Sequence, residues 1–161
     1  MPIVNMDNRP KIYLAGLISV DYPQSLEWRE RVQPTLEGWG FEVISPMRGK
    51  KNLKNETIDG GITSSAITSK SIVLRDRRDV LESDVILMHL ENFGSPRPLI
   101  GTMCEAAWAY DQRTPVVAIA RADNYLMRNH PFLVEFISRY EEDEERALIF
   151  IKQYYCRRSE I

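Results

Sequence analysis

Residues 85–90 read Val-Ile-Leu-Met-His-Leu, an almost continuously apolar run that predicts a strand buried on both faces of a sheet. Other apolar runs occur before and after it, at 11–15, 41–45, 115–120 and 136–140. Segments with a helical spacing of apolar residues separate these runs, at 22–38, 65–82, 101–111 and 143–155. Strands that alternate with helices in this way are typical of a parallel sheet with crossover helices.

We therefore predict the α/β class: a single doubly wound domain, flavodoxin-like or Rossmann-like, with a five-stranded, mainly parallel sheet. An N-terminal tail is expected over residues 1–10 and the domain over residues 11–161. Pro34 is expected to break the first helix, and Asp143 to cap the last. Three loops are expected, over 47–64, 91–100 and 121–131.

The composition excludes several classes of protein. Of the 161 residues, 43% are hydrophobic and 27% are charged, which is ordinary for one globular domain. The net charge of -2 argues against a nucleic-acid surface, and no apolar run reaches the roughly 20 residues that span a bilayer. The polar first nine residues argue against a signal peptide, and Cys104 and Cys156 form neither a disulfide framework nor a ligand spacing. We expect a cytoplasmic protein without a nucleic-acid or membrane partner.

The carboxyl ends of the strands are where a doubly wound sheet binds ligands. After the run at 85–90, Gly101-Thr102-Met103-Cys104-Glu105 is predicted to open a helix with Glu105 in its first turn, where the helix dipole favours a carboxylate. Gly101 lets a substrate approach the backbone closely. An anionic carboxylate at a pocket edge suits nucleophilic attack on an electrophilic carbon. Alternatively, Glu105 only decorates a helix start, and spacing alone does not exclude this.

Three other polar features are open to a plain and a functional interpretation. Arg48, in a basic loop, either holds a 5′-phosphate or is solvated surface. Asp79, in the mixed-charge stretch 75–79, reads as part of a salt-bridge ladder, and spacing alone does not bring it to the carboxyl edge. His89 and His130 have no partners at metal-ligand spacing, so we expect no metal and no cofactor.

Three stretches in order, 12–16 (IYLAG), 78–86 (RDVLESDVI) and 101–109 (GTMCEAAWA), resemble the nucleoside 2-deoxyribosyltransferase family, which includes the 2′-deoxynucleoside 5′-phosphate N-hydrolases. The similarity runs from about Lys11 to Ala120. It implies that Glu105 attacks C1′ of a deoxyribosyl group, that Tyr13 hydrogen-bonds Glu105, and that Asp79 helps place the base and its proton. The substrate-binding residues that we infer beside them are Gly16, Gly101, Thr102, Asn129 and Arg48.

The resemblance implies exchange of the nucleobase of 2′-deoxynucleosides, with a free nucleobase as the second substrate. The alternatives are hydrolysis of a 2′-deoxynucleoside 5′-phosphate, or a non-catalytic nucleotide-binding module with the same fold. One departure concerns Leu99, because the family often has an aspartate there. We also expect a homo-oligomer, at least a dimer, since the apolar segment 131–134 and the tyrosines 154 and 155 are unusual in water and the loop with Asn129 would lie near a neighbour's pocket.

Overall fold

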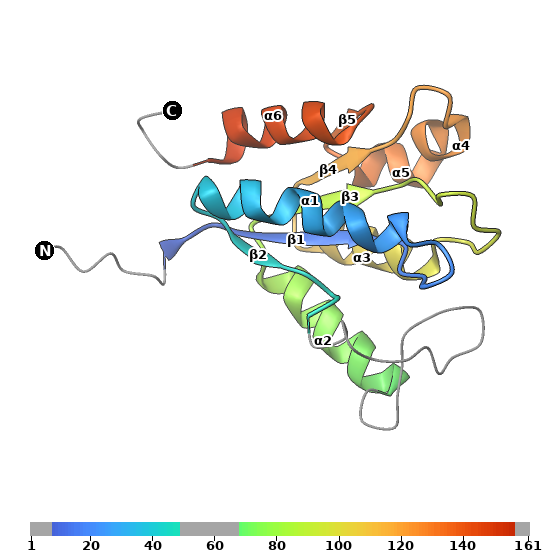
Figure 1. The fold of residues 1–161 in the computed structure, drawn as a ribbon, viewed down its shortest axis with the longest axis horizontal. Helices are drawn as coiled ribbons and strands as arrows, with labels where there is room; N and C mark the ends of the chain where they lie inside the picture. Colours follow the sequence, from blue (N-terminus) through green and yellow to red (C-terminus); the bar gives the residue numbers. More distant parts are fainter. Residues whose placement is uncertain (1–7, 49–67, 157–161) are drawn as a thin grey trace, which may run out of the picture.

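The computed structural model describes residues 8–48 and 68–156. Its five strands form one parallel sheet in the order β2-β1-β3-β4-β5 (Figure 1). The strands are β1 (Lys11–Gly16), β2 (Glu42–Ile44), β3 (Val85–His89), β4 (Val116–Ile119) and β5 (Arg139–Glu141). The helices are α1 (Gln24–Gly38), α2 (Ser69–Glu82), α3 (Ile100–Asp111), α4 (Tyr125–Asn129), α5 (Pro131–Phe136) and α6 (Glu144–Tyr155). The predicted α/β doubly wound class is confirmed.

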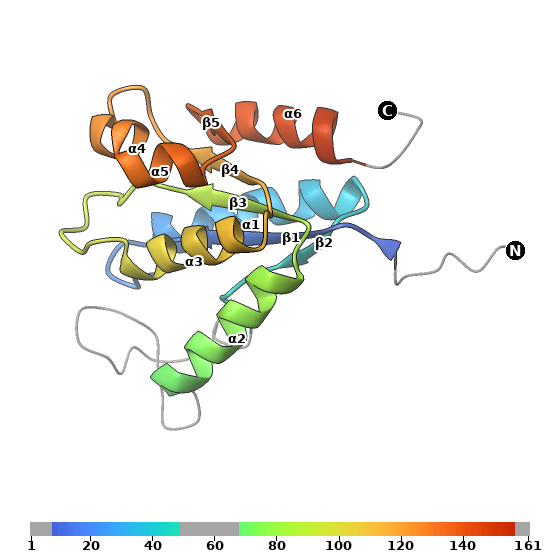
Figure 2. The ribbon, with the colours of Figure 1, turned by 180° about the vertical axis from the view of Figure 1, so that it is seen from behind.

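The helices form two layers, one on each face of the sheet (Figures 1 and 2). On one face, Trp28, Val32 and Leu36 of α1 and Ala147 and Ile151 of α6 pack with alternate residues of the strands. On the other face, α2, α3 and α5 supply the apolar side chains that complete a second core. Strand β3 is buried along its whole length, as its apolar composition predicted.

The first helix corrects the expectation for Pro34. Helix α1 runs continuously from Gln24 to Gly38 with Pro34 inside it. Proline removes one backbone donor and disturbs the turn before it. The buried face that Trp28, Val32 and Leu36 share continues past Pro34, so tertiary packing outweighs this local cost.

The region after β4 corrects a second expectation. Most of the loop predicted at 121–131 and the start of the strand predicted at 136–140 are helical, as α4 and α5. Pro131 occupies the first turn of α5, and the His130 ring nitrogen Nδ1 accepts a hydrogen bond from the Phe132 amide. The strand β5 therefore begins only at Arg139.

The end of the chain agrees with its sequence pattern. The Asp143 carboxylate accepts a hydrogen bond of 2.8 Å from the Arg146 amide and caps α6 as predicted. Most of the loop expected at 47–64 lies outside the described residues. Within the described ranges, no helix is both long and apolar enough to cross a membrane.

Candidate active site

The strand order places a topological switch point between β1 and β3. Both strands are central and parallel, with Tyr13 in register with Ile86 and Gly16 in register with His89. The helix that follows β1 covers one face of the sheet, and the helix that follows β3 covers the other. The connections therefore diverge at the carboxyl ends of these two strands, where such sheets bind ligands.

Glu105 lies on the buried face of α3, together with Thr102, Ala106 and Ala109. The side chain is only 8% exposed, which is unusual for a glutamate. Because α3 begins at Ile100, Glu105 is in its second turn, so the first-turn position inferred from the sequence was wrong. The helix dipole acts mainly within the first turn, so other groups must stabilise the charge of Glu105.

Tyr13 of β1 is fully buried beside this carboxylate. Burial raises the pKa of its phenol well above 10, and the charges of Glu105 and Asp76 raise it further. Hydrogen bonding to Glu105 acts on the pKa in the same direction. Among the described residues, the buried Tyr13 oxygen has no hydrogen-bond partner of standard geometry, although Glu105 is near enough to affect its pKa. Tyr13 is therefore protonated at neutral pH and lies beside the Glu105 side chain.

Asp79, the other acid implied by the resemblance, faces Arg48. The Arg48 Nη1 atom lies 2.7 Å from the Asp79 Oδ2 atom, and the Asp79 side chain is 8% exposed against 46% for Arg48. Arg75 of α2 holds the turn that carries Arg48, donating to the carbonyls of Pro46 (2.7 Å) and Arg48 (3.0 Å). Arg48 is therefore held in place as the counter-ion of Asp79, although about half of its side chain is exposed to solvent.

Asp76 is a site residue that the sequence reasoning missed. Its charge raises the pKa values of Tyr13, Arg29 and Arg48. Asp76 and Asp79 are three residues apart, so they share one face of α2. That spacing in the stretch Arg-Asp-Arg-Arg-Asp (75–79) is the signal that could have identified the pair, since the buried Val80 shows which face of the helix turns inward.

The structure distinguishes the remaining predicted residues by their surroundings. A Cβ atom on Gly16 would lie 3.1 Å from the His89 carbonyl oxygen, and its φ of +153° favours glycine, so the residue is explained by packing between strands. Gly101 is exposed with open space around it, and Thr102 is buried one turn before Glu105. Asn129 is exposed on α4 and donates to the Tyr125 carbonyl (2.8 Å). Leu99 packs into the core, where it cannot replace an acid.

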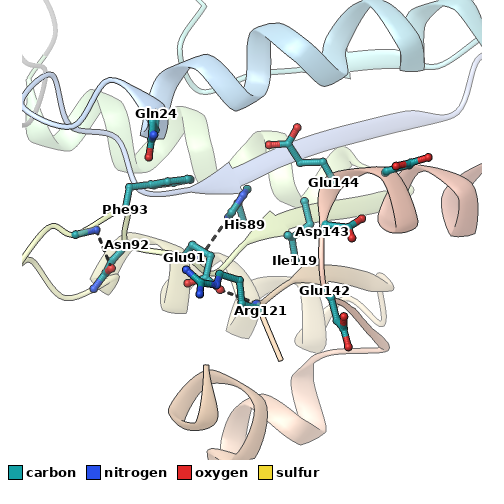
Figure 3. Close-up of a pocket in the computed structure, with 12 residues that line it drawn as sticks. Gln24, His89, Glu91, Asn92, Phe93, Ile119, Arg121, Glu142, Asp143 and Glu144 are labelled. Carbon is teal, nitrogen blue, oxygen red and sulfur yellow. Dashed lines mark hydrogen bonds between the residues drawn. The ribbon is translucent and has the colours of Figure 1, made fainter. Parts of the chain in front are cut away.

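Three cavities formed by described residues lie in this part of the molecule, and neither Glu105 nor Tyr13 lines them. One of about 650 Å³ is lined by Arg48, Arg75 and Asp79. A second, of about 660 Å³, opens over His89 and Phe93 and is rimmed by the acidic start of α6 (Figure 3). A third, of about 1010 Å³, is mainly apolar and lies between the β3–α3 loop and the helices α3, α4 and α5. In the part of the chain that the structure describes, no group of three or more metal-ligating side chains could hold an ion.

His89 is a structural residue at the edge of the second cavity. Its ring lies between Trp28 and Phe93, with ring centroids 5.1 Å and 4.8 Å away. Burial, with smaller effects from Arg29 and Arg31, lowers its pKa to about 3. Neutral imidazole follows, and its Nδ1 atom accepts a hydrogen bond from the Glu91 amide (3.3 Å).

The fold and this arrangement define a class of protein: a doubly wound α/β domain that binds its ligand at the switch point of the sheet and carries a buried carboxylate and a tyrosine there. The profile of the nucleoside 2-deoxyribosyltransferase family matches residues 12–145, so the chain belongs to that family. The family includes glycosyl transferases and N-glycosidases. A search of curated proteins found no match.

Solved structures share the fold at low sequence identity. A 2-deoxyribosyltransferase from Bacillus psychrosaccharolyticus is 18% identical (TM-score 0.62; 89% of this chain and 91% of that chain covered). The CMP N-glycosidase BcmB from Clostridium botulinum is also 18% identical (TM-score 0.56; 89% and 99%). A conserved protein from Enterococcus faecalis is 21% identical (TM-score 0.63; 90% and 98%).

Proposed function

We propose that this protein exchanges the nucleobase of 2′-deoxynucleosides through a covalent deoxyribosyl ester of Glu105. The observation that carries the proposal is the buried Glu105 facing the protonated Tyr13 at the switch point of the sheet. A carboxylate held in this way is a nucleophile positioned by a hydrogen-bond donor. Family membership supplies the substrate class, a deoxyribosyl group on a nitrogen base.

The first step forms the ester. A Glu105 oxygen attacks C1′ from the face opposite the base, the C1′–N bond breaks, and its electron pair leaves with the base nitrogen, which takes up a proton. The transition state carries positive charge on the sugar, so a fixed anion beside C1′ stabilises it. In the second step the nitrogen of the incoming base attacks C1′ and loses its proton, and the ester electrons return to Glu105. Two inversions retain the configuration at C1′.

The acidic face of α2 serves the base in this proposal. Arg48 orients Asp79, and the charge of Asp76 raises the pKa of Tyr13. Either carboxylate could hold the proton that the leaving base takes up and the incoming base returns. Leu99 leaves the β3–α3 loop without the aspartate common in the family, so α2 is the element on which we place this task.

Hydrolysis is the second candidate, favoured by the likeness to the CMP N-glycosidase. Water would then attack C1′ in place of the second base. For the half-exposed Arg48, binding of a 5′-phosphate was one of two interpretations, but the nearby Asp79 carboxylate would repel a phosphate. This charge arrangement favours an uncharged 5′-hydroxyl and therefore nucleosides.

Two incubations, one with deoxyinosine and cytosine and one with a deoxynucleoside 5′-monophosphate, separate the candidates. With deoxyinosine and cytosine, the transferase produces deoxycytidine and hypoxanthine in equal amounts. Hypoxanthine without deoxycytidine identifies a nucleoside hydrolase, and base release only from a deoxynucleoside 5′-monophosphate identifies a nucleotide hydrolase. Absence of turnover with every substrate would contradict the proposal and leave the non-catalytic binding module. The Glu105→Gln variant is the matched control for adventitious activity.

A further inference from the structure

The cavity of about 660 Å³ over His89 lies on the other face of the sheet from Glu105. His89 packs on Trp28, which belongs to the core beneath α1 and α6. Tyr13 and the buried face of α3, which carries Glu105, belong to the core on the opposite face. The sheet therefore separates this cavity from the candidate nucleophile, and the proposed reaction leaves the cavity unused.

His89 presents a hydrogen-bond donor to the cavity. Its side chain is 5% exposed, and its ring is held between Trp28 and Phe93. Because Nδ1 accepts a hydrogen bond from the Glu91 amide (3.3 Å), the proton of the neutral ring is on Nε2. Within the described ranges no residue accepts a hydrogen bond from Nε2. A buried donor without an acceptor is costly, and an acceptor oxygen of a ligand would remove that cost.

Carboxylates dominate the charge of the cavity. Five of them are in the lining that the described residues form, against one cationic side chain, that of Arg121. The five are Glu91, Glu142, Asp143, Glu144 and Glu145. Arg31 pairs with Glu144 (2.6 Å) and Arg146 with Glu142 (2.8 Å), so with Arg121 three of the five negative charges are balanced. The other two outweigh the partial charge of about half a positive unit at the start of α6, and the cavity favours a cation.

The donor and the carboxylates lie a short way apart, with apolar surface beside them. In Figure 3, Asp143 and Glu144 lie on one side of the His89 ring and Phe93 lies on the other. Ile119 also lines the cavity. An inorganic cation would leave the Nε2 donor without an acceptor and the apolar surface uncovered. An organic ammonium compound that also carries a hydroxyl group matches all three features.

We propose that this cavity binds amino alcohols, amino sugars among them. The ammonium group lies among the carboxylates at the start of α6, a hydroxyl oxygen accepts the hydrogen bond of His89 Nε2, and the carbon skeleton packs on Phe93 and Ile119. The inference goes beyond the proposed function and does not depend on it, because the residues that it uses are not those of the reaction at Glu105.

The test uses three matched small probes, with the Nε2 signal of His89 followed by ¹H–¹⁵N NMR. 3-Aminopropan-1-ol should shift this signal in a saturable manner with a Kd of about 1 mM, as expected for so small a ligand. Propane-1,3-diol, which lacks the ammonium group, should bind roughly tenfold more weakly or worse. Propylamine, which lacks the hydroxyl group, should leave the Nε2 signal in place.

Two results with the wild-type protein would overturn the inference. One is the absence of a saturable shift with 3-aminopropan-1-ol at about 100 mM, far above the expected Kd. The other is an equal shift with propylamine, which would show that the acidic rim attracts any cation and that His89 donates to no ligand.

Three variants locate the binding. Glu145 forms no ion pair within the described residues, and Glu145→Gln should weaken binding of 3-aminopropan-1-ol about twofold to fivefold, as expected for one exposed charge. Glu135→Gln removes a carboxylate of α5 outside the lining and should keep the wild-type Kd. Glu105→Gln should also keep it, whether or not the protein exchanges bases. Equal Kd values in wild type and Glu145→Gln, or loss of binding in Glu105→Gln, would contradict a separate site at the start of α6.

Discussion

The hydroxyl of Tyr13 is the smallest group on which the proposed reaction depends. Tyr13→Phe should lower kcat/KM about tenfold to a hundredfold, because a lost hydrogen bond to a charged group costs about 1.5–3 kcal/mol. Tyr140→Phe is the matched control, since it removes the hydroxyl that donates to the Met127 carbonyl (2.7 Å) on another element. Equal losses in both variants, measured as initial rates of base exchange, would show that Tyr13 has no special role.

The raised pKa of Tyr13 also makes the stability depend on pH at the alkaline end. The folded state holds this proton more tightly than the unfolded state, whose tyrosine pKa is about 10. The contribution of protonated Tyr13 to the free energy of unfolding is therefore complete below pH 10, and it is lost as the pH rises toward the pKa of the folded state. Urea unfolding at pH 9 and pH 11 should show a smaller loss of stability in Tyr13→Phe than in wild type, and an equal loss would contradict the assignment.

Glu105 supplies the bond-forming oxygen in the proposed reaction. Glu105→Ala should abolish base exchange, while the protein still folds, because alanine is well tolerated in a helix. Mass spectrometry of wild type with substrate and without acceptor should detect a deoxyribosyl adduct on the peptide containing Glu105. Activity in the alanine variant, with its melting temperature and circular dichroism unchanged, would exclude this mechanism.

His89 should make the protein less stable in acid. Its folded pKa of about 3 lies below the unfolded value near 6.5, so the unfolded state binds a proton first as the pH falls. The stabilisation by neutral His89 is present above pH 6.5 and decreases by at most about 1.4 kcal/mol per pH unit between pH 6.5 and 3. His89→Asn keeps an acceptor for the Glu91 amide but cannot titrate. The slope of unfolding free energy from pH 7 to 5 should be shallower in this variant, and identical slopes would refute the prediction.

The sequence identified single site residues only where they belong to a recognisable motif. The resemblance selected Glu105 and Tyr13, and the structure places both at the switch point. It did not select Asp76, because a charged helix of the pattern 75–79 reads equally well as solvated surface until the buried side is known. The helix start was misjudged for a physical reason: no side chain of the usual capping type marks it, and Leu99, an apolar core residue, occupies the cap position.

At the scale of one element, α2 carries the two acids that could serve the base. Asp76→Asn and Asp79→Asn should each slow exchange, and the residue that holds the proton should slow poor leaving groups more than activated ones. We expect Asp79→Asn to change the ratio of rates for a natural deoxynucleoside and one with an activated base. A ratio changed only in Asp76→Asn would transfer the role to Asp76, and an unchanged ratio in both variants would exclude α2 from proton transfer.

Other elements show where sequence patterns stop being informative. Central strands are continuous apolar runs and were located to within one residue at β1, β3 and β4. The segment 131–140 mixes aromatic and branched residues that suit a strand as well as a helix. Its first half becomes α5 because Pro131, the His130 cap and the burial of Leu133 in the core that α3 also lines favour a helix there. Tertiary contacts decided a case that propensity left balanced.

For the whole molecule, the class and the parallel connections followed from the alternation of strands and helices, since crossovers of this kind are nearly always right-handed and place helices on both faces. The strand order could not be derived from the sequence alone, because nothing local specifies that β1 lies between β2 and β3. The side-chain distances at the site depend on that order. They were therefore accessible only through the structure.

We predict that the protein assembles into a homo-oligomer. Helices α4 and α5 expose Leu126 (63%) and Phe132 (67%) beside the apolar cavity of about 1010 Å³. Leu133, next to Phe132, is 4% exposed and completes the chain's own core, so only part of this segment is available to a neighbour. Apolar patches of this kind mark interaction surfaces.

We expect light scattering at micromolar concentration to give at least a dimer, and Phe132→Glu to give a monomer, because a charge in an apolar interface must be desolvated. Ile149→Glu, which places the same charge on an exposed site of α6, is the control and should keep the wild-type mass. A monomeric wild type would exclude the homo-oligomer, and dissociation by Ile149→Glu alone would place the interface on α6.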